Sequence, residues 1–149
     1  MRITLLLLLL GMLQPTVAQR TRLPLSPRTY KGRMLIVGSG GGFAGGSVTY
    51  YLLDNGRLFG KRSTDTAYTP LPRQSLARTK RLFTELETKA RVKTTRFNEP
   101  GNTYQFVGWQ RGSVRHEVVW GRAGTTPPAD YPRFYQTFMA LIPASAQLD

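Results

Sequence analysis

The stretch Val37–Leu53, VGSGGGFAGGSVTYYLL, places six glycines within nine residues around one aromatic residue, Phe43. Three roles are open for it: a phosphate-binding loop, a structural bend, or a binding loop that presents Phe43. The segment after the glycines separates the first role from the other two. Ser47–Leu53 alternates and is rich in β-branched and aromatic residues, which predicts a strand.

This predicted strand argues against a bound nucleotide. Gly40–Gly45 matches the pattern G-x-G-x-x-G, and Asp65 lies about 20 residues further on, where a ribose-binding acid is expected. A dinucleotide site, however, needs a helix after the glycines, because the pyrophosphate binds to the free N–H groups of the helix N-terminus. The segment Ser47–Leu53 offers no such terminus, and no Lys-Ser or Lys-Thr pair directly follows the glycines.

The first 18 residues form a predicted secretory signal peptide. Arg2 supplies a positive start, Ile3–Leu13 is an apolar run, and Thr16-Val17-Ala18 is a small-residue cleavage site. The run is about half as long as the ~20 apolar residues that a membrane-spanning helix needs. We therefore expect residues 1–18 to be removed and the mature protein to be exported, either to the periplasm or outside the cell.

Composition restricts the chemistry of the mature chain. There is no cysteine, and one histidine, His116, with eight dispersed carboxylates does not give the spacing of a metal site. No G-x-S-x-G sequence supports a Ser/His/Asp triad. We expect a protein that is not an enzyme and holds no cofactor or metal. The formal net charge of +13 favours acidic partners, although it also serves general solubility.

Alternating segments predict about five strands, four of them in two hairpins. Arg33–Ser39 indicates a short buried strand. Asn55-Gly56 follows Ser47–Leu53, and this dipeptide predicts a type I′ turn with positive φ at both residues. A second hairpin is expected around Gln110-Arg111-Gly112. In its last strand His116 shares a face with Val118 and Trp120, which predicts a partly buried, hydrogen-bonded residue rather than a catalyst.

Two segments have the periodicity of amphipathic helices, Arg73–Val92 and Asp130–Ile142. Asp130 is the expected cap of the second helix, and Pro143 follows its end. The expected buried stripe of the first helix is Leu76, Lys80 (by its stem), Phe83, Leu86 and Ala90. The expected stripe of the second is Tyr131, Phe134, Tyr135, Phe138, Leu141 and Ile142.

Together these elements predict one α+β domain over residues 33–143. Its antiparallel sheet would carry the two helices on one face and leave the other face solvated. Residues 19–32 are expected to form an irregular leader and residues 144–149 a flexible tail. We expect one domain, because about 130 residues are enough for one core and too few for two, and we expect this domain to be a monomer.

Two roles remain for the glycine loop, a structural bend or a presented aromatic. A plain hairpin turn needs two glycines at most, so six suggest more than a bend. Phe43 either folds back into the core or projects toward a partner.

The segment Ser39–Gly45, SGGGFAG, resembles a motif of the emfourin family, small protein inhibitors of thermolysin-like metalloproteases. The order of elements over about residues 33–142 is similar too, including the segment Val114–Val119, VRHEVV. This chain differs in its predicted signal peptide, its proline-rich leader, an extra glycine before Phe43, and its Asn-Gly hairpin with the basic arm RLFGKR. The resemblance implies a partner-binding loop made of Gly41, Gly42, Phe43, Ala44 and Gly45.

The sequence therefore predicts an exported binding protein that acts as a stoichiometric protease inhibitor through its glycine-rich loop. A loop of small residues with one aromatic fits the groove and apolar pockets of a secreted protease. The alternative is a basic accessory domain that binds acidic surface polymers or nucleic acid. In that case Lys and Arg side chains, with exposed aromatics such as Tyr104 and Trp109, would make the contacts.

Overall fold

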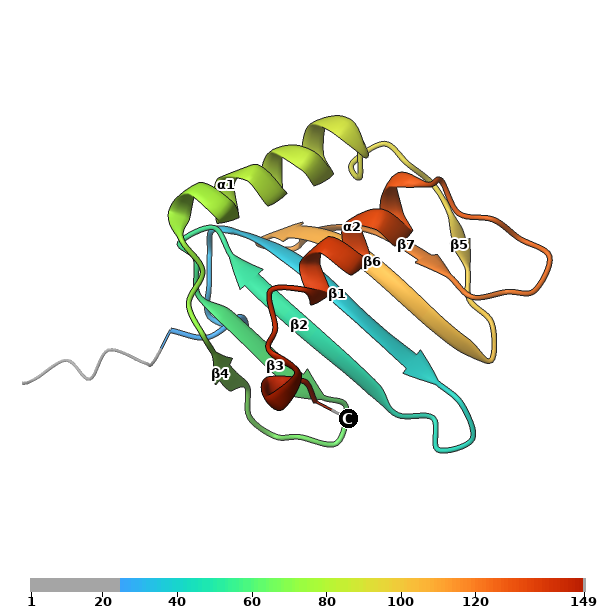
Figure 1. Cartoon of the computed structure of the whole chain (residues 1–149), viewed down its shortest axis with the longest axis horizontal. Coiled ribbons are helices and arrows are strands. Elements are labelled where there is room, and N and C mark those ends of the chain that lie inside the picture. Colours follow the sequence, from blue (N-terminus) through green and yellow to red (C-terminus); the bar gives the residue numbers. More distant parts are fainter. Residues whose placement is uncertain (1–24, 149) are drawn as a thin grey trace, which may run out of the picture.

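The computed structural model describes residues 25–148, so the predicted signal peptide, residues 1–18, lies outside the described residues. The domain is α+β, as expected (Figure 1). The strands are β1 Arg33–Gly41, β2 Ser47–Leu53, β3 Leu58–Arg62, β4 Thr69–Leu71, β5 Asn98–Glu99, β6 Thr103–Arg111 and β7 Val114–Trp120. The helices are α1 Leu76–Thr84, its π-helical continuation η1 Glu85–Lys89, α2 Asp130–Met139 and the 3-10 turn η2 Ala144–Ala146.

The described strands form one seven-stranded sheet in the order β4-β3-β2-β1-β6-β7-β5. The prediction of a purely antiparallel sheet of about five strands was wrong. β4 and β5 are two additional edge strands, and β5 pairs parallel to β7. Both additions are very short. β4 contains Pro70, which an edge strand tolerates because one side of it needs no ladder hydrogen bonds. Such segments have the composition of loops, and they are strands only because they pair with β3 and β7.

Both predicted hairpins form, but with different turns. Gly56 has φ +86°, whereas Asn55 does not have a positive φ, so the type I′ prediction was wrong. Instead the Gly56 N–H donates to the Leu53 carbonyl and the Leu53 N–H to the Arg57 carbonyl, both at 2.9 Å, in a three-residue loop that ends on a left-handed glycine. The second turn is Gly112-Ser113, shifted from the predicted position, since Arg111 pairs with Val114.

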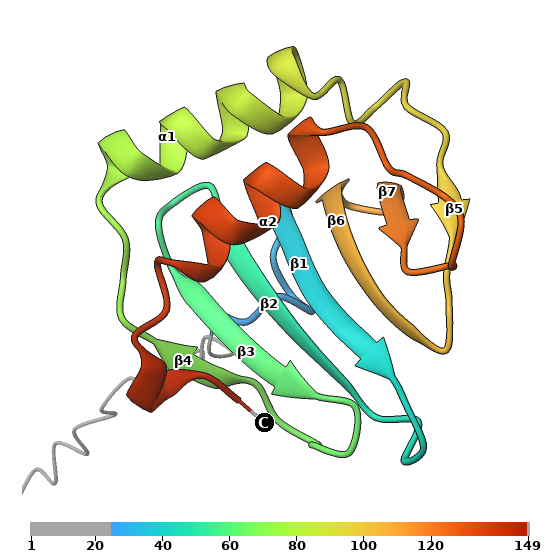
Figure 2. The same ribbon diagram turned by 45° about the vertical axis from the view of Figure 1, so that its right-hand side comes forward.

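Both helices lie on one face of the sheet, as predicted, and cover its upper part in Figures 1 and 2. In α1 the Ser75 hydroxyl caps the helix by accepting from the Arg78 N–H. The predicted stripe was wrong at its start, because Leu76 and Lys80 are exposed. Thr79 is buried instead, and its hydroxyl donates to the Ser75 carbonyl, which satisfies the polar group. The buried stripe is Thr79, Leu82, Phe83, Leu86 and Ala90.

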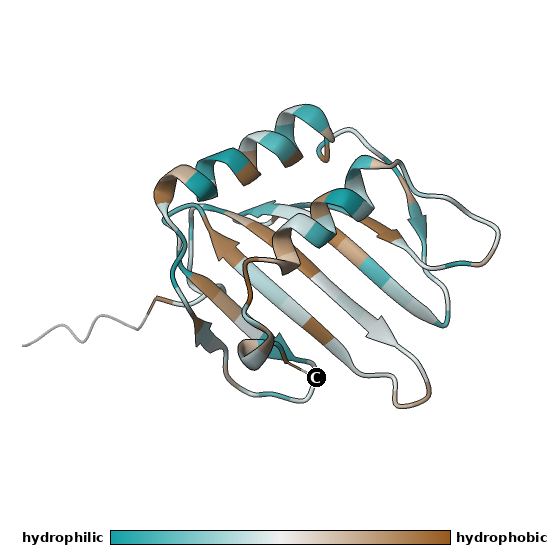
Figure 3. Ribbon diagram, in the orientation of Figure 1, coloured by the Kyte–Doolittle hydropathy of each residue, from teal (hydrophilic) through white to brown (hydrophobic). Residues whose placement is uncertain are grey.

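The aromatic stripe of α2 packs into the core as predicted, with Tyr131, Phe134 and Phe138 fully buried. The Tyr131 hydroxyl donates to the Ala90 carbonyl at 2.8 Å and so links the two helices. Asp130 is the first residue of the helix rather than its cap, because Ala129 holds the cap position and makes no side-chain bond. Figure 3 shows that the outer faces of both helices are largely hydrophilic.

The second face of the sheet is not simply solvated, which corrects the sequence-based expectation. It carries its own buried cluster of Met34, Ile36, Leu53, Phe59 and Phe106. The leader packs against this cluster through Leu25 and Tyr30. The Tyr30 hydroxyl donates to the Asp54 carboxylate. Residues 25–32 of the predicted leader contain no helix or strand, and they pack as part of the domain.

The C-terminal residues also belong to the domain, although they were predicted to form a flexible tail. After η2, the Leu148 N–H donates to the Tyr50 hydroxyl at 2.8 Å. The Leu148 side chain lies over Gly60, where a Cβ atom would approach it to 2.8 Å. The absence of a side chain at position 60 therefore leaves room for the tail on the helix-bearing face of the sheet.

Candidate interaction site

The glycine loop forms the turn between β1 and β2, at the end of the sheet that the helices do not cover (Figures 1 and 2). The Gly45 N–H donates to the Gly42 carbonyl at 3.1 Å, and the Gly41 N–H donates to the Gly46 carbonyl at 2.9 Å. The Gly42 N–H donates to the Asn102 carbonyl at 2.8 Å, which ties the turn to the segment before β6. The base of the turn is thus held by three backbone hydrogen bonds.

Phe43 stands at the tip of this turn and is 111% exposed. The alternative in which Phe43 folds back into the core is therefore wrong. The turn is coloured hydrophobic at its tip in Figure 3. Leu76 and Val114 are also exposed, at 61% and 54%, but Phe43 exceeds both.

Most of the glycines have a structural reason, which weakens the argument that six are more than the bend needs. Gly41 and Gly42 have φ +92° and +81°, a region that side chains rarely adopt. A Cβ atom on Gly41 would come within 2.0 Å of the Asn102 carbonyl oxygen. The loop composition is consequently explained by the backbone path, whereas the exposure of Phe43 is not.

The hairpin that carries Phe43 is uncharged over most of its length. The sequence from Met34 to Leu53 contains no Asp, Glu, Lys or Arg, in a protein of formal net charge +13. The tip therefore presents an apolar ring without nearby side-chain charge in the same hairpin. This feature is visible in the sequence, and charge patterning would have found it.

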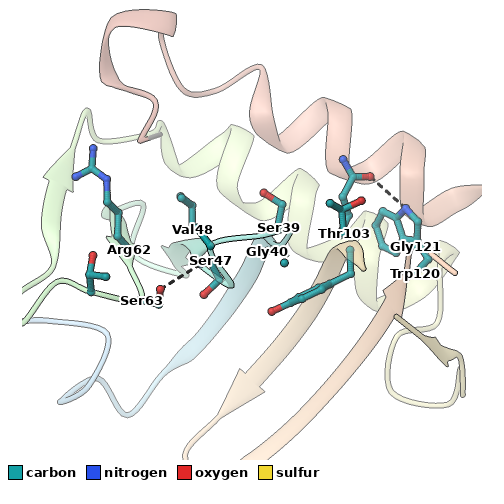
Figure 4. Close-up of a pocket in the computed structure, with 15 residues that line it drawn as sticks. Ser39, Gly40, Ser47, Val48, Arg62, Ser63, Thr103, Trp120 and Gly121 are labelled. Atoms are coloured by element: carbon teal, nitrogen blue, oxygen red, sulfur yellow. Dashed lines mark hydrogen bonds between the residues drawn. The ribbon is translucent and has the colours of Figure 1, made fainter. Parts of the chain in front are cut away.

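Beside the loop lies an open groove of about 680 Å³, which the sequence did not predict. Ala44 and Gly46 of the loop line one side of it. Its floor contains one row of residues that lie directly opposite one another on five strands: Arg62, Val48, Ser39, Gln105 and Trp120. Since strands lie about 4.8 Å apart, the row spans about 19 Å. Figure 4 shows Ser39, Val48 and Arg62 pointing to the same side of the sheet.

The groove surface is mostly apolar, and its polar part includes hydroxyls, one amide and one guanidinium. The Trp120 indole N–H donates to the Gln105 amide oxygen at 3.1 Å (Figure 4), and this bond does not use the N–H groups of the Gln105 amide. Ser39 and Thr103 add hydroxyls, and the Arg62 guanidinium stands at one end of the row. None of the residues that line the groove is Asp or Glu.

The other residues singled out in the sequence do not gather into a site. His116 is half-buried, with its ring 5.9 Å from that of Trp109. Trp109 is only 6% exposed and lies under the Lys93 ammonium at 4.3 Å, and Tyr104 is half-buried, so neither is the exposed aromatic that polymer binding called for. The residues after Gly40–Gly45 form β2, so no helix N-terminus follows the nucleotide-like pattern.

Residues 25–148 contain neither a metal-binding cluster nor a membrane-spanning helix. No group of three or more His, Asp or Glu side chains there is placed to hold a metal ion. In the same part of the chain, every helix is too short or too polar to cross a membrane.

Comparison with known proteins assigns neither a family nor a function to the chain. No model of a protein family matches the chain, and a search of curated proteins found no match either. The resemblance to emfourins therefore stays a prediction, based on the residues of the loop and the order of the elements.

Proposed function

We propose that this protein is an exported binding protein that inserts Phe43 into an apolar pocket of a partner protein. The observation that carries the proposal is the full exposure of Phe43 at the tip of a turn with a hydrogen-bonded base. An exposed phenylalanine is unfavourable in water, and its burial in a partner recovers that free energy. Because the turn is already ordered, little conformational entropy is lost on binding.

The favoured partner is a secreted metalloprotease of the thermolysin type. Such an enzyme offers a groove with apolar side pockets, into which a narrow turn of small residues with one aromatic can enter. The resemblance of Ser39–Gly45 to the emfourin motif supports this class of partner, and the predicted signal peptide would bring the protein to secreted enzymes. Inhibition is then stoichiometric, because the turn occupies the cleft.

Inhibition assays against a panel of thermolysin-like enzymes test the proposal, using the wild-type protein at micromolar concentration at low and high salt. We expect inhibition of at least one enzyme that changes little with salt, since the contact is apolar. If no enzyme is inhibited, the protease proposal is wrong. Binding to heparin or DNA that falls steeply with salt would instead support the alternative of a basic accessory domain, because counterion release drives such binding.

A further inference from the structure

We infer that the groove beside the Phe43 turn is the second half of the same interface, and that it receives an extended, carboxylate-bearing segment of the partner. This inference rests on the proposed function. The groove is defined by its central row, Arg62, Val48, Ser39, Gln105 and Trp120, with Thr103 at its rim.

The first argument is the size of the contact. A phenylalanine side chain buries about 150–250 Å², whereas a stable interface buries about 800 Å² on each partner. Phe43 alone therefore supplies too little surface, and the partner must cover a neighbouring part of the molecule. Because Ala44 and Gly46 form part of the groove wall, a partner that holds the Phe43 ring also sits over the mouth of the groove.

The second argument is the chemistry of the groove. Its polar side chains are the Gln105 amide, the Arg62 guanidinium, the Trp120 indole and the hydroxyls of Ser39, Ser47, Ser63, Thr64, Thr103 and Tyr104, and no carboxylate lines it. The amide, the hydroxyls and the guanidinium, which carries five N–H groups, can each donate to an acceptor, and a carboxylate is the strongest acceptor that a protein segment carries. The overall charge of +13 adds a favourable long-range field for an acidic segment.

The third argument is the direction of the groove. Its row runs across β3, β2, β1, β6 and β7, and the three central strands are already paired on both sides. A partner segment cannot add here as another strand, since that needs a free edge. It must lie across the strands and use side-chain contacts, for which a row of about 19 Å offers room for about six extended residues.

The chain itself offers a matched pair of variants. Gln105 and Gln110 both lie on β6, but on opposite faces and toward opposite ends of the sheet. Each uses its amide in one hydrogen bond, Gln105 with the Trp120 indole and Gln110 with the Gly112 carbonyl. Gln105→Trp fills the groove, and Gln110→Trp makes the same change elsewhere. The probe is the thermolysin-like enzyme that the wild-type protein inhibits most strongly.

We expect Gln105→Trp to raise the inhibition constant at least tenfold, with Gln110→Trp within twofold of wild type and both variants folded by thermal unfolding. Equal effects of the two variants, or no effect of Gln105→Trp while Phe43→Ala weakens inhibition, would overturn the inference and leave the proposed function standing. If the wild-type protein inhibits no enzyme, the proposed function fails and the inference fails with it.

A second pair tests the predicted charge of the segment and does not depend on filling the floor of the groove. Thr103 is exposed at the rim, so substitutions there leave the core intact. Thr103→Glu should weaken inhibition at least fivefold, and Thr103→Lys should leave it unchanged or strengthen it. The opposite order would show that the segment is not acidic and would overturn this part of the inference.

Discussion

The Tyr104 ring lies over Gly40, the residue directly opposite it on β1. A Cβ atom on Gly40 would come within 2.6 Å of the Tyr104 hydroxyl oxygen. Phe106 lies over Gly38 in the same way, with its ring 2.5 Å from the position of such an atom. In each pair, the aromatic ring on β6 occupies the space that a side chain on the opposite residue of β1 would need. These rings pack the strand that leads into the Phe43 turn.

This relationship predicts an energetic coupling between Tyr104 and Gly40. Gly40→Ala should destabilise the protein by about 1–2 kcal/mol, because the new methyl group meets the ring. In the Tyr104→Ala background the cost of Gly40→Ala should be smaller by at least about 0.5 kcal/mol, as expected for residues in contact. Chemical unfolding of the four proteins measures the cycle. An equal cost in both backgrounds would mean that the ring does not set the need for glycine.

Gly46→Ala is the control for this cycle. Gly46 does not have a positive φ, and a Cβ atom there would meet nothing within 4 Å. We expect its free energy of unfolding to stay within about 0.5 kcal/mol of wild type.

Gly56 should not accept a β-branched side chain. Its φ is +86°, and a Cβ atom would lie 2.5 Å from the Gln74 carbonyl oxygen. Gly56→Val should therefore lower the free energy of unfolding by about 1–3 kcal/mol. Asn55→Asp is the control, since it keeps an acceptor for the Arg57 N–H and places no demand on φ. Unchanged thermal unfolding of Gly56→Val would refute the left-handed conformation.

The contact between Tyr30 and Asp54 should weaken at alkaline pH. Burial, followed by the hydrogen bond to Asp54, raises the pKa of Tyr30 from 10.0 to about 12. The folded state therefore favours the protonated phenol, so its stabilising effect is complete below pH 10 and is lost as the pH rises toward 12. The difference in Tm between wild type and Tyr30→Phe should become less favourable to wild type across this range. A constant difference would show that Tyr30 does not titrate in this way.

Much of the fold follows from local patterns. The spacing of Phe134 and Phe138 predicts the buried face of α2, and the glycines at positions 56 and 112 indicate the two hairpins. The turn types did not follow, because Asn55 tolerates either sign of φ and the neighbouring Gln74 backbone helps to select one. The edge strands β4 and β5 could not be recognised, since three and two residues carry no periodicity.

The candidate site was predictable only in part. The uncharged loop around Phe43 is visible in the sequence, but whether the ring is exposed depends on how far the hairpin extends beyond the helices. The groove was not predictable, because Ser39, Gln105 and Trp120 come together only through the register of three strands. Likewise the sequence predicts an exposed Tyr104, but its ring packs over Gly40 of the neighbouring strand and is half-buried.

The central claim is that Phe43 serves binding rather than folding, and the Phe43→Ala variant tests it most directly. Leu76→Ala is the matched control, since Leu76 is also a large exposed hydrophobic residue. For both variants we expect a change of less than about 1 kcal/mol in the free energy of unfolding. Inhibition of the target protease should weaken by about 2 kcal/mol or more in Phe43→Ala alone, as at an interface hot spot. A loss of about 3–5 kcal/mol of stability in Phe43→Ala, the cost of emptying a core site, or undiminished inhibition by that variant, would contradict the account.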